Sequence, residues 1–109
     1  MEKSVRYNHR QLSKGAREFM RDLFKAYRFT KKQRRLLLAL TTLKPEGIEK
    51  LAVQTRSKNI KSLVRDTNIR IKRNHLEKQI QICSSFWDLG LKGLYSLRFK
   101  PFTLQNPKN

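Results

Sequence analysis

The sequence predicts a mostly α-helical domain with a small β-hairpin near its C-terminal end. Apolar side chains recur at helical spacing between residues 12 and 74, and they alternate at strand spacing from residue 79 onward. The chain is also strongly basic: 26 Lys and Arg residues against 8 Asp and Glu residues give a formal net charge of +18 over 109 residues. Because this length supports one hydrophobic core, we expect a flexible basic arm (1–11), a single domain (12–100) and a tail (101–109).

The first element of the predicted domain is an amphipathic helix over residues 12–27. Its apolar residues fall within an arc of about 120° at helical spacing, and its other face is basic. Ser13 is the expected N-cap, because its hydroxyl can accept a hydrogen bond from a free amide of the first turn. Aromatic residues at this spacing are typical of a core. The apolar set is Leu12, Ala16, Phe19, Met20, Leu23, Phe24 and Tyr27.

Thr30 is the expected cap of a second helix, TKKQRRLLLALTTL, whose second half has leucine on nearly all sides. A helix that is apolar all round is buried all round, so this helix should be central. Pro45 and Gly47 should end it, and a short helix is expected over 48–54.

The segment Thr55–Asn74 separates an apolar face from a basic face most cleanly. Long basic side chains suit phosphates and guanine edges, and short or apolar ones suit thymine methyl groups. A solvated basic face on an ordinary surface helix is the alternative. The stripe expected to face the core is Ile60, Leu63, Val64, Thr67 and Ile71, and the opposite arc carries Lys58, Lys61, Ser62, Arg65, Ile69, Lys72 and Arg73. A short helix, a brief turn and a longer basic helix form a helix-turn-helix arrangement.

A β-hairpin is expected after Asn74. Ile80 and Ile82 alternate with polar residues, and Cys83 in this run should be a small buried hydrophobe. Gly90 and Gly93 flank a two-residue tip, Leu91 and Lys92, ahead of a second apolar strand.

This order of elements resembles a winged helix-turn-helix domain with an extra N-terminal helix. The likeness, over residues 29–99, is to the DNA-binding effector domains of bacterial response regulators and to the winged helices of plasmid and phage replication initiators. It depends on FTKKQRRLLLAL, NIKSLVRDTNIRIKR and GLKGLYSL. The resemblance implies basic contacts at Arg65, Arg70 and Lys72.

We therefore expect a sequence-specific double-stranded DNA-binding protein, a transcriptional regulator or an origin-binding factor of bacterial or phage type, in the cytoplasm with the nucleoid. The recognition helix (56–73) would enter the major groove, and the wing near 90–93 would contact the backbone or minor groove. The expected contacts are Arg6, Arg10, Arg56, Lys58, Lys61, Ser62, Arg65, Ile69, Lys72, Arg73 and Lys92. The helix over 12–27 is a candidate homodimer interface.

Other chemistry is not indicated by the sequence. The acidic residues are scattered, and His9 and His75 have no partners at ligand spacing, so we expect no catalytic site, metal, cofactor or small-molecule ligand. No apolar run approaches the roughly 18 residues that span a bilayer. Two alternatives stay open: an RNA-binding or ribosome-associated basic protein, and a winged-helix interaction module for an acidic partner.

Overall fold

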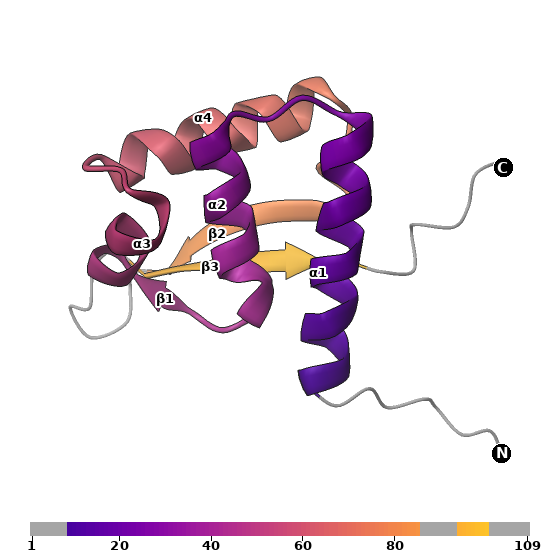
Figure 1. The fold of residues 1–109 in the computed structure, drawn as a ribbon, viewed down its shortest axis with the longest axis horizontal. Coiled ribbons are helices and arrows are strands. Elements are labelled where there is room, and N and C mark those ends of the chain that lie inside the picture. The colour runs from indigo at the N-terminus through magenta and orange to yellow at the C-terminus, as the bar shows by residue number, and fades with distance from the viewer. Residues whose placement is uncertain (1–8, 86–93, 101–109) are drawn as a thin grey trace, which may run out of the picture.

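The computed structural model describes residues 9–85 and 94–100, and Figure 1 shows how they are arranged. In chain order the elements are α1 (His9–Ala26), α2 (Lys31–Ala39), the 3-10 turn η1 (Leu40–Thr42), β1 (Glu46–Gly47), α3 (Ile48–Thr55), α4 (Ile60–Arg73), β2 (Ile80–Ser85) and β3 (Leu94–Phe99). Helices α1 and α2 cross in front of a small antiparallel sheet, and α4 lies along its edge. A mostly helical chain with a small β component is therefore confirmed.

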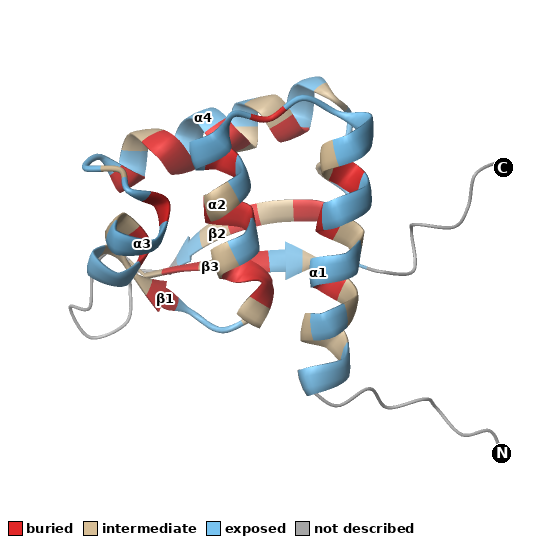
Figure 2. Ribbon diagram, in the orientation of Figure 1, coloured by how far each residue is buried: buried red, intermediate tan, exposed pale blue. Residues whose placement is uncertain are grey.

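A single hydrophobic core lies between the helices and the sheet, and Figure 2 shows its residues on the inward faces. All five residues of the apolar stripe predicted for α4 are buried, which confirms the orientation of that helix. Burial of each large aliphatic side chain stabilises the fold by about 1.5 to 3 kcal/mol. The other elements contribute Met20, Leu23, Leu36, Leu37, Leu40, Leu51, Ile80, Ile82, Tyr95 and Leu97.

Helix α1 begins earlier than the sequence predicts. It starts at His9, so residues 9–11 are helical and do not belong to an arm. Ser13 lies inside the helix and is not its N-cap. Its Oγ instead donates a hydrogen bond of 2.6 Å to the backbone oxygen of Thr41, which joins α1 to η1. Residues 1–8, including Arg6, lie outside the described part of the chain.

Helix α2 has the predicted cap but not the predicted burial. The Thr30 hydroxyl accepts from the Gln33 amide at 3.1 Å, and the Gln33 side chain accepts from the Thr30 amide at 2.9 Å, a complete capping box. Leu38, however, is 39% exposed, so the expectation of a helix buried on all sides is wrong. The helix is nevertheless central, because it packs against α1, α3 and α4. The 3-10 turn that follows it ends at Leu43, which takes a left-handed conformation with φ of 60°, two residues before Pro45.

The sheet has one strand more than the sequence predicts. Strand β1 pairs antiparallel with β3, placing Glu46 opposite Tyr95, and the strand order is β1-β3-β2. A strand of two residues is too short to show an alternating pattern, so the sequence contains no signal for it.

The pairing of β2 with β3 confirms the two predicted strands. Their register places Ile80 opposite Phe99 and Ser85 opposite Leu94. The tip itself, with Gly90, Lys92 and Gly93, lies outside the described residues. Ile80 and Ile82 are buried as predicted, but Cys83 is only half-buried because it lies on the other face of the sheet.

A buried carboxylate connects η1, β1 and α3. Glu46 is 7% exposed; its Oε2 accepts from the Thr42 hydroxyl at 2.7 Å, and its Oε1 lies 3.0 Å from the Lys50 ammonium. Burial alone raises the pKa of Glu46, but the Thr42 hydrogen bond and the charges of Lys50 and Lys44 outweigh it, so the pKa lies below its ordinary value. The ionised carboxylate therefore stabilises the folded state.

Replacing Glu46 by Gln should lower the free energy of unfolding at pH 7 by about 1 to 2 kcal/mol, chiefly by weakening the Thr42 bond, since Lys50 is largely exposed and screened. A lowered folded-state pKa gives a contribution that is complete above the unfolded value of 4.5 and is lost as pH falls through the folded value. Urea denaturation should therefore show the wild type and variant converging well below pH 4.5. Glu18→Gln, an exposed control on α1, should change little, and parallel pH profiles for Glu46→Gln would contradict the assignment.

Candidate nucleic-acid interface

The turn before α4 sets where that helix begins. Arg56 ends α3 in a left-handed conformation, with φ of 58°. Asn59 then caps α4, because its side-chain oxygen accepts from the Ser62 amide at 3.0 Å. Arg56 and Lys58 therefore lie in the turn, and the prediction that the recognition helix begins at residue 56 is wrong.

The remaining predicted residues of α4 lie on its outward side. Lys61, Arg65, Lys72 and Arg73 are exposed, and Ser62 is half-buried. Ile69 is 44% exposed and stands among these cations. Basic residues in the last turn also suit the negative end of the helix dipole. Arg70, which the family resemblance implies as a contact, is half-buried in a hollow that faces the start of α2.

Asn68 attaches α4 to the sheet. Its Oδ1 accepts from the Ile82 amide at 3.0 Å, and its Nδ2 donates to the Ile82 carbonyl at 2.9 Å. Strand β2 is an edge strand, so the backbone groups of Ile82 that point away from β3 have no strand to pair with. The Asn68 amide takes the place of that strand and fixes the rotation of α4 about its axis.

A groove of about 390 Å³ lies beside this attachment, between α4 and β2. Arg65, Lys72 and the exposed Ile69 line it from the helix, and Gln81 lines it from the solvent side of β2. Glu77 also lines the groove, and its buried Oε1 has no hydrogen-bond partner among the described residues. Donors, acceptors and an apolar side chain thus meet in one place, which is the chemistry that base edges require.

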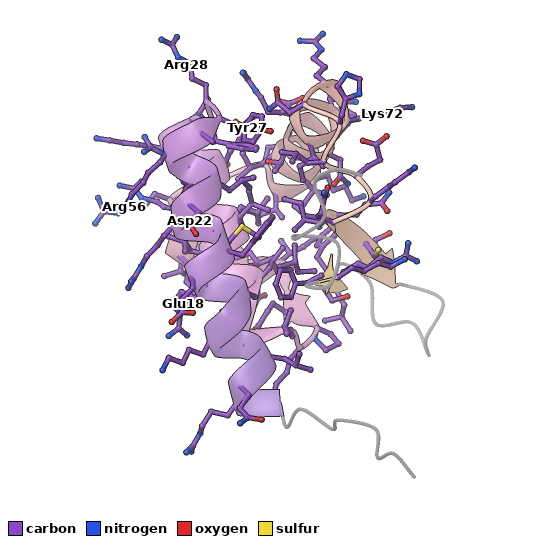
Figure 3. The ribbon with its side chains drawn as sticks, turned by 90° about the vertical axis from the view of Figure 1, so that its right-hand side faces the viewer. Glu18, Asp22, Tyr27, Arg28, Arg56 and Lys72 are labelled. Carbon is purple, nitrogen blue, oxygen red and sulfur yellow. The ribbon has the colours of Figure 1, made fainter. Side chains whose placement is uncertain are left out.

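The predicted contact residues do not all gather on this surface. Figure 3 shows α1 on one side of the molecule and Lys72 of α4 on the other. Arg56 lies in the turn between α3 and α4, which Figure 1 shows at the end of the molecule far from α1. Arg10 lies in the first turn of α1. Gln81 and Glu77, in turn, were missed by sequence analysis. Strand alternation places Gln81 on the solvent face, but only the packing of α4 brings it next to Arg65.

No family model, curated protein or solved structure matches this chain. Within residues 9–85 and 94–100, no three His, Cys, Asp or Glu side chains are grouped so that they could hold a metal ion. In the same part of the chain, each helix is too short or too polar to cross a membrane.

Replacing Asn68 by Ala should reduce the free energy of unfolding by about 1 to 3 kcal/mol, because it leaves both backbone groups of Ile82 without a partner. The loss is expected even though alanine favours a helix more than asparagine does. Lys61→Ala, on the same helix, is the control and should stay within about 0.5 kcal/mol of the wild type. Urea unfolding measures both, and an unchanged midpoint for Asn68→Ala would show that the attachment contributes no stability.

Proposed function

We propose that this chain is a sequence-specific double-stranded DNA-binding protein of winged helix-turn-helix type that places α4 in the major groove. The observation that supports this most is the outward side of α4, where exposed Arg65 and Lys72 flank Ile69 beside the groove between α4 and β2. A winged helix-turn-helix domain consists of three helices, the third of which is basic, followed by paired strands. The elements α2, α3, α4, β2 and β3 occur in this order.

The dimensions and chemistry of α4 fit a B-form major groove. A groove about 12 Å wide admits one α-helix, and Arg or Lys can bind guanine O6 and N7 there. Ile69, which is 44% exposed, is suited to a thymine methyl group. The net charge of +18 adds attraction to any nucleic acid, so specificity must come from this small set of side chains.

The proposal includes a role in transcription or replication control, without catalysis and in association with the nucleoid. A homodimer through α1 is not part of it. The apolar face of α1, with Ala16, Met20 and Leu23, is already buried against the rest of the chain, and the outward face carries charged residues such as Glu18 and Arg21.

Selection of bound fragments from a random duplex library is the first experiment, and it should enrich a defined motif. Replacing Arg65 by Ala should then weaken binding to that motif by about 1 to 3 kcal/mol if the guanidinium pairs with a guanine. The difference in affinity between the motif and scrambled duplex should also become smaller. The matched control is Arg56→Gly. It also removes one positive charge, glycine suits the left-handed backbone there, and the motif preference should persist.

Titrations of both variants on the motif and on scrambled duplex give the comparison. If Arg65→Ala keeps the wild-type preference, α4 does not read the sequence. Competition with an RNA duplex of equal length tests the main alternative, because the A-form major groove is too deep and narrow for a helix. A library that yields no motif, together with preferential binding of RNA, would replace this proposal by the RNA-binding one.

A further inference from the structure

A second basic surface lies between α1 and the segment from η1 to α3. It is an open groove of about 710 Å³, larger than the one beside α4. Ser13 and Thr42 contribute hydroxyl groups to it. Its charged lining consists of Arg10, Lys14, Arg17, Lys44, Lys50 and Glu46.

The cations of this groove are not neutralised by the protein itself. Glu46 is the one carboxylate in the lining, and it is already engaged by Lys50 and Thr42. Within the described residues, Lys14 and Arg17 have no ion-pair partner. The groove therefore keeps a strong positive potential that an external anion can satisfy.

The basic lining continues along α1 as a regular stripe. Its members are Arg10, Lys14, Arg17, Arg21 and Lys25, and all are exposed. They recur every three or four residues, so at helical geometry they fall within an arc of about 80°, about 4.5 to 6 Å apart along the axis. Glu18 and Asp22 lie beside the stripe and not within it, as Figure 3 shows for this face of α1. From Arg10 to Lys25 the stripe is about 22 Å long.

The lining also excludes two other kinds of ligand. A small-molecule site encloses its ligand with mainly apolar walls, whereas this groove is open and its lining is charged and hydroxylic. A docked peptide needs buried apolar or aromatic anchors, and the lining offers none. Exposed cations repeated along a helix are instead groups that contact sugar-phosphate backbones without reading bases.

We propose that the α1 groove binds the phosphate backbone of a second nucleic-acid duplex, so that one protein molecule joins two duplexes. This inference depends on the proposed function, since α4 holds the first duplex. The two surfaces are separate, because α1 and α4 lie on different sides of the molecule in Figure 3. Binding in the groove should be independent of sequence and sensitive to salt.

A capture assay tests this proposal. Duplex containing the selected motif is fixed to beads, full-length protein is added below saturation, and a labelled duplex of random sequence is supplied in solution. Three variants each reverse two exposed cations and thus lower the net charge equally: Lys14→Glu with Arg17→Glu in the groove, Lys61→Glu with Arg65→Glu on α4, and Lys31→Glu with Lys32→Glu at the start of α2. Circular dichroism confirms that each variant is folded.

The groove variant should bind the fixed motif with its sequence preference intact but capture at least about tenfold less labelled duplex. The α2 variant should capture like the wild type. Capture by the groove variant at the wild-type level would overturn the proposal and point to bridging through paired copies of α4. Absence of capture by the wild type would also overturn it. Polyglutamate serves as an anion without a sugar-phosphate backbone, and a groove variant that loses binding to polyglutamate but captures duplex normally would overturn the proposal as well.

The α4 variant separates this inference from the function it depends on. If that variant keeps the motif preference while the groove variant loses capture, α4 is not the reading helix, yet the groove is still a backbone site. If the α4 variant loses the preference for the motif, and the groove variant captures as much labelled duplex as the wild type, the proposed function holds and the second site is wrong.

Discussion

The pair of hydrogen bonds between Asn68 and Ile82 is the constraint on which the rest of the arrangement depends. An apolar stripe alone fixes only which side of a helix faces the core, and it tolerates some rotation and sliding. A side-chain amide bonded to both backbone groups of one residue in an edge strand removes that freedom. It also decides that Arg65 and Lys72 face the solvent side of β2, so the groove between helix and strand is a consequence of this contact.

Elements with a strong local signal could be predicted from the sequence. The five buried residues of α4 repeat at helical spacing, and Thr30 and Gln33 have the spacing of a capping box. Ile80 and Ile82 alternate with polar residues, as in a strand with one face exposed to solvent. Features set by distant partners could not be predicted. The register of β2 depends on β3, β1 exists only because it pairs with β3, and the exposure of Leu38 depends on which side of α2 the sheet covers.

The candidate site shows the same division. Exposed cations on α4 follow from its periodicity, so Lys61, Arg65 and Lys72 could be predicted one by one. Their surroundings could not, because Gln81 and Glu77 reach the groove only through tertiary packing. The position of Arg56 among the basic residues of the segment 55–74 also led to a wrong prediction, namely that Arg56 belongs to the recognition helix. Its left-handed backbone ends α3, so Arg56 lies in the turn before α4, whereas Lys72 lies in the last turn of that helix.

The charge distribution explains how so basic a chain can fold. Unlike charges must compensate wherever cations approach one another closely, and the buried Glu46 does so between Lys44 and Lys50, at the floor of the α1 groove. Most other cations of the described residues are exposed, so water and salt screen their repulsion and the electrostatic cost of folding is small. A bound polyanion would relieve most of the electrostatic repulsion among the cations of the α4 surface and among those of the α1 groove. Because the two surfaces are on opposite sides of the molecule, a single duplex of limited curvature leaves one of them unsatisfied, and this remaining positive potential favours a second strand of phosphates.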